Sequence, residues 1–128
     1  MRVFPDMHPM TRQVGIALYH SGGTVARLAG QEVGNYFGAD ATSFAELKGR
    51  IETAVDLIRG VTPAQLEGSE DRKFELTQAG ETFNFSGQVF LQNHALPQFC
   101  FHIATAYNIL RHAGVKIGKC DFLGELQC

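Results

Sequence analysis

The 128-residue sequence lacks the features that mark membrane-spanning, exported and nucleic-acid-binding proteins. No apolar run approaches the ~20 residues that a transmembrane helix needs, and the N-terminal MRVFPDMHPM has no hydrophobic segment of a signal peptide. Lysine and arginine are scattered, and the formal net charge is -2, so no basic surface for nucleic acid is predicted. We therefore expect no membrane partner, no nucleic-acid partner and a cytoplasmic location.

Cysteine is scarce, and no catalytic motif is present. The chain has three cysteines, Cys100, Cys120 and Cys128, an odd number without C-x-x-C spacing. We expect them to be reduced thiols. No G-x-S-x-G, H-E-x-x-H, phosphate-loop or dinucleotide-binding motif occurs. The sequence therefore leaves open whether the protein is an enzyme.

What the chain does contain is an ordinary globular balance of residues. Apolar residues make up 45% and charged residues 19% of the sequence. Because a chain of this length can bury a sizeable core, we predict that residues 1–128 form a single domain.

The longest pattern in the chain begins at Ser86, a helix N-cap. Pro97 interrupts the helical run, and Gly114 ends it. Apolar residues surround most of this helix, which is typical of a central, buried helix, so Cys100 is expected to be inert packing. One half of the helix carries Ala95, Leu96, Phe99, Cys100, Ile103, Ala106, Tyr107 and Leu110.

Another helix is predicted over residues 6–29, with Gly30 as its stop. Gly22 and Gly23 are unusual within it, since each mid-helix glycine costs ~1 kcal/mol relative to alanine. They predict a kink or close helix packing, and the alternative is that a ligand or a partner backbone approaches there. The apolar stripe consists of Met10, Val14, Ala17, Leu18, Val25 and Leu28, with Gln13, His20 and Thr24 along one edge.

A third helix and a hairpin lie between these two helices. Ser43 and Glu46 form a capping box that starts a helix ending at Gly60. Residues 73–77 and 82–86 alternate between apolar and polar, which predicts a β-hairpin. An isolated hairpin is barely stable in water, so its apolar side chains are expected to pack on the helices. These side chains are Phe74, Leu76, Phe83 and Phe85.

Several segments resemble one uncharacterised family. FHIATAYNILRHAGVKIGKCDFLG, at residues 101–124, is similar to the C-terminal signature of the family called domain of unknown function nineteen-ninety-three. FPDMHPMTRQVGIA and VARLAG, within residues 4–30, resemble its second helix, and residues 44–47 resemble its third. That family belongs to the DinB/YfiT-like superfamily of helical bundles. The resemblance implies a mainly α, up-and-down bundle, here with the small β-hairpin before the last long helix.

The resemblance also implies that one helix is missing. Members of the family usually carry one more long helix before the segment that contains Asp6. Three helices are predicted here, and the fourth is either absent or supplied by a partner chain. Because an uncovered apolar groove favours association, we expect a homodimer or a helix-swapped oligomer.

Metal-binding members of the superfamily use three histidines, one on the second helix and an H-x-x-x-H pair on the last. By resemblance, His102 occupies the last ligand position, and Gln98 stands four residues earlier. The second-helix position falls near Gln13, and His20 lies two turns further along. The resemblance thus implies a candidate site for a divalent metal, Zn²⁺ or Ni²⁺, at these four residues.

The available donors argue against a tight metal site. Zn²⁺ and Ni²⁺ favour imidazole, thiolate and carboxylate over the glutamine amide. His20, His94 and His102 form an alternative set, but eight helical residues span ~12 Å, too far for His94 and His102 to share one ion unless Pro97 distorts the helix. Two other interpretations stay open: His102 and Gln98 are buried polar groups bonded across the bundle, or they line a metal-free pocket for a small molecule.

Two functions are therefore compatible with the sequence. In the first, a polar site between helices around His102 binds a small molecule or a divalent metal. In the second, the chain is a non-catalytic helical module that self-associates or binds a partner through an apolar groove. The sequence predicts neither the ligand nor the pathway.

Overall fold

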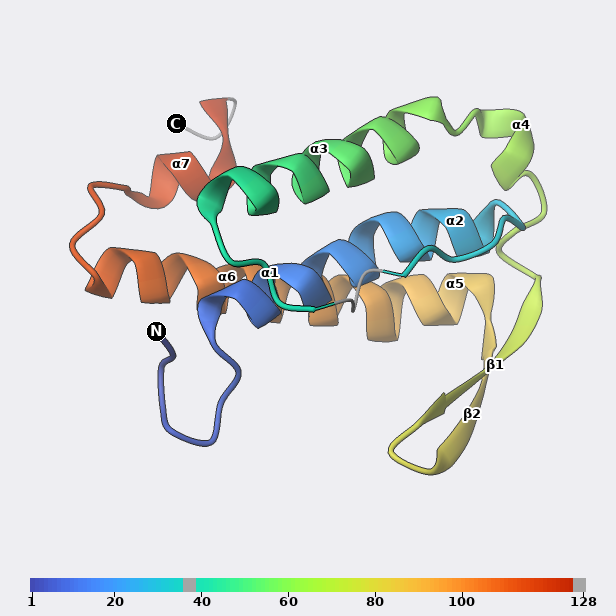
Figure 1. Ribbon diagram of the computed structural model, residues 1–128. Coiled ribbons are helices and arrows are strands. Elements are labelled where there is room, and N and C mark those ends of the chain that lie inside the picture. Colours follow the sequence, from blue (N-terminus) through green and yellow to red (C-terminus); the bar gives the residue numbers. More distant parts are fainter. Residues whose placement is uncertain (36–38, 126–128) are drawn as a thin grey trace.

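The computed structural model describes residues 1–35 and 39–125. The chain is mainly helical, with a small hairpin before the last long helix (Figure 1), which confirms the predicted fold class. In chain order, the elements are α1 (Met10–Leu18), the π-helical segment η1 (Tyr19–Gly23), α2 (Thr24–Leu28), α3 (Phe44–Gly60), α4 (Pro63–Leu66), β1 (Lys73–Gln78), β2 (Glu81–Ser86), α5 (Gly87–Phe90), the π-helical segment η2 (Leu91–Ala95), α6 (Leu96–His112) and α7 (Lys119–Leu123).

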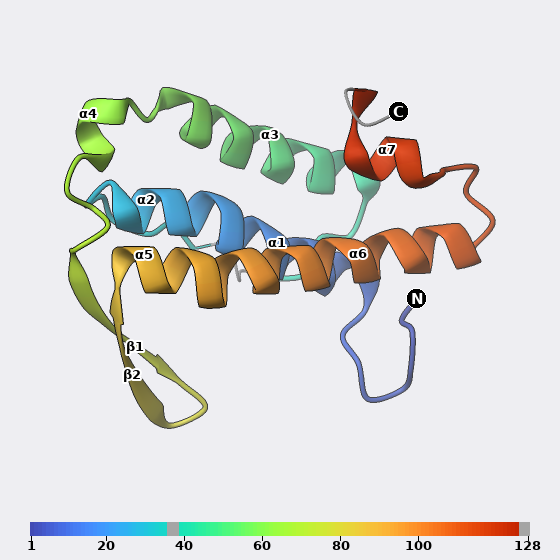
Figure 2. The same ribbon diagram turned by 180° about the vertical axis from the view of Figure 1, so that it is seen from behind.

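The first helical run, α1–η1–α2, is the central one. It lies between α3 and the run α5–η2–α6 in both views (Figure 1 and Figure 2), and it buries Val14, Ala17 and Leu18. The prediction that the last long helix is central is wrong, since Phe101 is 56% exposed and Leu96 is 49% exposed. α6 packs mainly against α1, and no other described helix covers its outward apolar side chains.

Two π-helical segments widen the long runs without ending them. η1 contains the pair Gly22 and Gly23, both buried, so the kink that they predict is a wider turn, a feature often found at functional sites. η2 lies just before Pro97. A proline ring conflicts with the carbonyl four residues earlier and has no N–H to donate. The wider turn therefore lets the helix continue through Pro97 instead of stopping there.

The hairpin is confirmed, and each strand is one residue longer at the turn than predicted. β1 pairs antiparallel with β2. Ala79 and Gly80 connect them, and both have positive φ, 52° and 82°. Positive φ at both central residues is the requirement of a type I′ turn, whose twist matches that of the two strands.

The base of the hairpin packs on the helices, and its tip projects away from them (Figure 1). The rings of Phe74 and Phe85 lie 4.8 Å and 5.5 Å from the ring of Phe90, a buried residue on α5. Phe83, nearer the tip, is 42% exposed. The expectation that the apolar hairpin residues pack on the helices therefore holds at the base and fails at Phe83.

α3 begins at the predicted cap and covers one side of the central run. The Glu46 N–H donates to Ser43 Oγ at 3.1 Å, and the Glu46 carboxylate accepts from the Thr42 N–H at 2.9 Å. The reciprocal bond of the capping box thus reaches one residue further back than the sequence predicts. Leu47 is buried in the core cluster, whereas Ile51 is exposed, so the apolar face of this helix is only partly covered.

The C-terminal segment corrects the expectation for the cysteines. Cys120 in α7 is disulfide-bonded, so the expectation of a reduced thiol is wrong for this residue. Cys100 is free and exposed, because its side of α6 faces solvent, and it is not the inert packing predicted. Cys128 lies outside the described residues. In α7, the ring of Phe122 lies 5.9 Å from the ring of Tyr107 on α6.

Candidate functional site

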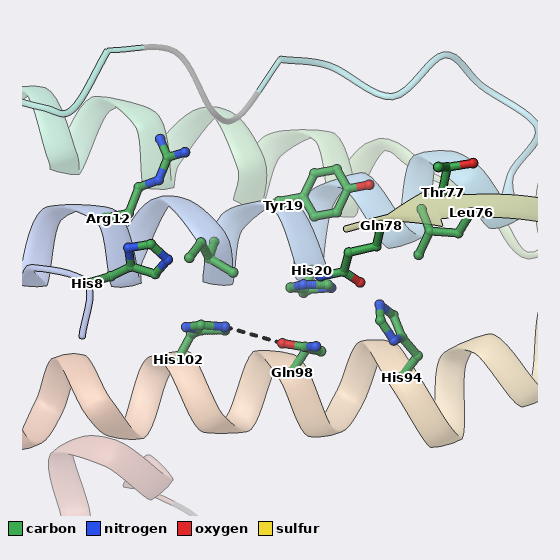
Figure 3. A pocket seen from close by; sticks show the side chains of 11 residues that line it. His8, Arg12, Tyr19, His20, Leu76, Thr77, Gln78, His94, Gln98 and His102 are labelled. Carbon is green, nitrogen blue, oxygen red and sulfur yellow. Dashed lines mark hydrogen bonds between the residues drawn. The ribbon is translucent and has the colours of Figure 1, made fainter. Parts of the chain in front are cut away.

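A cavity of about 350 Å³ lies between the central helical run and the run η2–α6, and residues of β1 line one end of it (Figure 3). Most of its lining residues are of polar types, and four of them are histidines. We call this cavity the histidine pocket. Its lining residues are His8, Arg12, Ile16, Tyr19, His20, Leu76, Thr77, Gln78, His94, Gln98 and His102.

Each π-helical segment supplies one histidine to the pocket. η1 supplies His20 and η2 supplies His94, and their ring centroids are 5.4 Å apart. His102 comes from α6, with its ring parallel to that of His20 at a centroid distance of 6.3 Å. Figure 3 shows the His20 ring between the other two, reaching from the facing helical run. The wider turns thus help to bring three imidazoles from two helical runs to one cavity.

Gln13 holds His102 across the bundle. The distance between His102 Nδ1 and Gln13 Oε1 is 2.6 Å, and both residues are buried. Gln13 Nε2 donates to the carbonyl oxygen of His8 at 3.2 Å, which orients the amide with its oxygen toward His102. The Nδ1–H of His102 is therefore the donor in this bond. The polar bond across the bundle exists, but Gln13 makes it and not Gln98.

The other ring nitrogen of His102 faces the pocket. Nε2 lies 3.2 Å from Oε1 of Gln98, the dashed contact in Figure 3. Burial, with the nearby His8 as a second cause, lowers the pKa of His102 below 6.5, so the ring is neutral at pH 7 and Nε2 is an acceptor. Gln98 satisfies Nε2 when its amide turns the NH₂ group toward the ring. A donor group of a ligand can take the same place.

His20 is the buried group without a partner. Its side chain is 7% exposed, and its Nδ1 has no hydrogen-bond partner among the described residues. Burial, followed by the charges of His94 and His102, lowers the pKa of His20 from 6.5 to about 4. A buried polar atom left unpaired costs about 1–3 kcal/mol. A ligand group that pairs with Nδ1 recovers that cost.

Arg12 brings a positive charge to the lining of the pocket, and none of the lining residues is acidic. Arg27 donates to the Tyr19 hydroxyl at 3.2 Å. After burial, the charge of Arg27 is the second cause that lowers the pKa of His94. Arg12 lines the pocket and lies 3.7 Å from the Asp40 carboxylate. That ion pair is partly exposed, so water screens it.

The donor set does not fit a divalent metal. In the described parts of the chain, no group of three or more His, Cys, Asp or Glu side chains is placed to hold a metal ion. The side chain of Gln13 already bonds His8 and His102, and the Gln98 amide is a poor ligand for Zn²⁺ or Ni²⁺. The metal site implied at His102, His20, Gln13 and Gln98 stays a prediction that this geometry does not favour.

The sequence predicts the centre of the pocket and misses its edges. Gln13 and Gln98 contact His102 as expected, and His20 lies beside them. His94, judged too far from His102 for the two to share one metal ion, lines the same pocket, and the His20 ring lies between the two. The missed residues lie in the N-terminal segment, in α1 and η1, and on the hairpin, whose approach to the helices has no local signal. They are His8, Arg12, Ile16, Tyr19, Leu76, Thr77 and Gln78.

A second cavity of about 520 Å³ is bordered by α1, α3, α6 and α7. We call it the apolar groove, because nearly all of its lining side chains are apolar. It opens on the side where the apolar face of α3 is incompletely covered. The lining includes Val14, Leu18, Ile51, Val55, Ile58, Phe99, Ile103, Leu110 and Phe122.

Long helices packed side by side, with a pocket between two of them, define a helical-bundle protein. Residues 1–123 match the family described as Domain of unknown function (DUF1993), and the chain belongs to this family. A solved structure, that of a DinB family member protein from Shewanella denitrificans, is similar with a TM-score of 0.80 and 34% sequence identity. The similarity covers 97% of this chain and 70% of that chain.

Neither the curated proteins nor the helix lengths add to what the family and the solved structure show. None of the curated proteins matches the sequence. In the described part of the chain, no helix combines the length and the apolar character that crossing a bilayer requires. The family is therefore shown, and what the chain binds has to be argued from its own residues.

Proposed function

We propose that the histidine pocket binds a small polar molecule without a metal ion. The observation that carries the proposal is His20, a residue that lines the cavity and whose buried Nδ1 has no partner among the described residues. Native proteins pair nearly all buried polar atoms, so such an atom needs a reason. A ligand that forms a hydrogen bond with Nδ1 when it binds explains why this nitrogen is unpaired in the unliganded protein.

The groups around the pocket are positioned before a ligand arrives. Gln13 sets the tautomer of His102, so that Nε2 presents a lone pair toward the cavity. Packed helices, not mobile loops, carry His20 and His102. The cavity of about 350 Å³ falls in the size range of small-molecule sites. Because these side chains are already ordered, ligand binding loses little free energy to side-chain ordering.

Small polar fragments should bind the pocket and shift the NMR signals of the His20 and His102 rings. The screen uses the full chain labelled with ¹⁵N-histidine, and a variant in which Ile16→Trp fills the cavity. Ile16 lines the pocket without contributing a polar side-chain atom, so the hydrogen bonds of His102 are retained. We expect fragment affinity to fall about ten-fold or more in this variant, because the occupied volume is lost.

Ile103→Trp is the matched control, because Ile103 lines the apolar groove and not the histidine pocket. Its fragment affinities should equal those of the wild type, and thermal unfolding checks that both variants are folded. The proposal fails if no fragment moves the histidine signals, or if Ile16→Trp binds fragments as tightly as the wild type. Stoichiometric Zn²⁺ or Ni²⁺ in the purified protein, lost in His102→Ala, would replace it with a metal site.

Self-association through the apolar groove is the second candidate function. Ile51, Ile58 and Phe122 border the groove and are 40%, 36% and 42% exposed. A contiguous apolar surface of this kind favours association, and two copies of one chain most often associate as a closed symmetric pair. We propose that a second copy of the chain covers the groove.

The cytoplasmic location expected from the sequence stays a prediction.

Light scattering on a sizing column should give twice the chain mass of 14.0 kDa. Ile51→Lys should convert the protein to a single chain, because a lysine charge cannot be buried in an apolar interface without a partner. Phe101→Lys is the control, since Phe101 is exposed on α6 but does not line the groove, and it should remain a pair. A wild-type mass of one chain excludes this function.

A further inference from the structure

We propose that the ligand of the histidine pocket carries an oxyanion, a carboxylate or a phosphate, attached to a small apolar body. The inference rests on the proposed function, because it names the chemical class of the molecule that the same pocket binds. Three features of the pocket support it: the charge of its lining, the unpaired nitrogen of His20 and an apolar part of the wall.

The lining offers hydrogen-bond donors and positive charge, and it contains no carboxylate. Arg12, whose guanidinium lies 3.7 Å from the Asp40 carboxylate, lines one end of the cavity, and Tyr19 lines its middle (Figure 3). An oxyanion accepts from such donors in charge-assisted hydrogen bonds, which are roughly twice as strong as neutral ones. A ligand whose polar end is a cation finds no acidic side chain in this lining.

His20 supplies the position where an anion oxygen is most needed. The residue is 7% exposed, and its Nδ1 is unpaired among the described residues. Its neighbours are rings: Tyr19 at 5.1 Å, His94 at 5.4 Å and His102 at 6.3 Å between centroids. These contacts are ring against ring and leave Nδ1 without an acceptor. With its proton on Nδ1, His20 donates to an oxygen of the bound anion.

The electrostatics of the pocket disfavours additional positive charge. His94 and His102 add to the effect of burial in lowering the pKa of His20, and Arg27 acts in the same direction on the pKa of His94. A cationic ligand would add one more positive charge to this cluster. His20, His94 and His102 are neutral at pH 7, so an anion is attracted by the Arg27 guanidinium, which donates to the Tyr19 hydroxyl. The low polarity of a buried site strengthens that attraction.

The cavity has room for more than an inorganic anion. A water molecule occupies about 30 Å³ of liquid, so a cavity of about 350 Å³ holds several times the volume of a bare oxyanion. Ile16 and Leu76 line part of the wall with apolar side chains. An oxyanion with a compact apolar group therefore fits the pocket better than free phosphate does.

Four benzene derivatives of similar shape and different charge test the proposal. Benzoate and phenyl phosphate are negative, benzamide is neutral and benzamidine is positive at pH 7. Each is titrated into the full chain while the NMR signals of the histidine rings are followed. We expect at least one anion to bind about ten-fold more tightly than benzamide, since its hydrogen bonds are charge-assisted, and benzamidine to bind most weakly. The tighter of the two anions identifies carboxylate or phosphate.

His20→Leu and Ile103→Trp are the variants for this titration. His20→Leu removes Nδ1 but retains a buried apolar side chain, so the affinity for the preferred anion should fall about ten-fold with the lost charge-assisted bond. Benzamide affinity should change less. Ile103→Trp alters only the apolar groove and should bind the anions as the wild type does.

Each other outcome overturns the inference. If benzamide or benzamidine binds in the pocket as tightly as both anions, the anion proposal is wrong and the small-molecule site stands. The same holds if other fragments bind there while all four probes fail. If the preferred anion binds His20→Leu with unchanged affinity, the assigned role of Nδ1 is wrong. If neither the probes nor any fragment binds, the proposed function fails together with the inference.

Discussion

The free energy of unfolding should fall by up to about 3 kcal/mol between pH 6.5 and pH 4, because His20 has to stay neutral in the folded protein. Its pKa is lowered from 6.5 to about 4 on folding. Between pH 6.5 and pH 4, His20 is therefore protonated in the unfolded chain and neutral in the folded protein. The stabilisation is fully present above pH 6.5 and is lost progressively as the pH falls toward 4. Each unit of difference in pKa corresponds to about 1.4 kcal/mol.

The groups that face His20 act in the same direction. Its ring contacts are His94 and His102 from the facing helical run and Tyr19 beside it. The pKa values of His94 and His102 are also lowered, in each case mainly by burial. Protonation of these groups in the unfolded chain adds to the loss of stability in acid. No acidic residue lines the pocket to reverse the sign.

Urea unfolding at pH 7, 6, 5 and 4 measures this effect. His20→Leu should flatten most of the pH dependence and should cost little stability at pH 7, because it also removes a buried unpaired nitrogen worth about 1–3 kcal/mol. His112→Gln is the matched control, since His112 is exposed at the end of α6, and it should retain the wild-type profile. A wild-type profile that is flat from pH 7 to pH 4 contradicts the prediction.

Gly87→Ala should destabilise the protein by about 3 kcal/mol, because the added methyl group has no space. A Cβ at Gly87 would lie 1.8 Å from the carbonyl oxygen of Ser69 and 3.1 Å from a methyl carbon of Leu28. The oxygen belongs to the backbone, so it cannot move aside as the end of a flexible side chain can. The close approach occurs where β2 passes into α5.

This junction fixes the base of the hairpin relative to the helices. The Gln88 N–H donates to the Glu70 carbonyl at 3.0 Å, and Arg72 donates to the Leu28 carbonyl at 3.0 Å. A shift of the backbone at Gly87 strains both bonds. Because β1 follows Arg72 directly and lines the histidine pocket, Gly87→Ala should also weaken binding in that pocket.

Gly49→Ala is the control for Gly87→Ala. Gly49 lies on α3, and a Cβ there would meet nothing within 4 Å. An alanine in a helix interior is favoured over glycine by about 0.5–1 kcal/mol, so this variant should be slightly more stable than the wild type. Thermal and urea unfolding of both variants decide the matter. A Gly87→Ala protein within about 1 kcal/mol of the wild type would contradict the packing argument.

The relation between sequence and fold differs from element to element. The cap at Ser43, the alternation of the hairpin strands and the helix stops at Gly30 and Gly114 are local features, and the structure contains each of them. Cys100 and Phe101 are apolar positions on a helix that reads as central, yet both are exposed. An apolar pattern shows that a helix can be buried. Whether it is buried depends on which other helices pack against it.

The candidate site shows the same division. The resemblance to the family places Gln13, Gln98 and His102 together, and hydrogen bonds connect them in the structure. His94 extends the site beyond these three residues. Its distance from His102 along the helix argues against one shared metal ion, and that argument concerns one helix alone. His20 on the facing run joins the two into one pocket.

The sequence by itself determined the helices, the hairpin and the family, because caps, stops and periodicity act over a few residues along the chain. Only the tertiary structure decided that α1–η1–α2 is central, that the two long runs contain π-helical turns and that a histidine of each turn faces the same cavity. These properties depend on how one helix packs against another. Burial and distances across a bundle are set jointly by both partners, and no local pattern carries them.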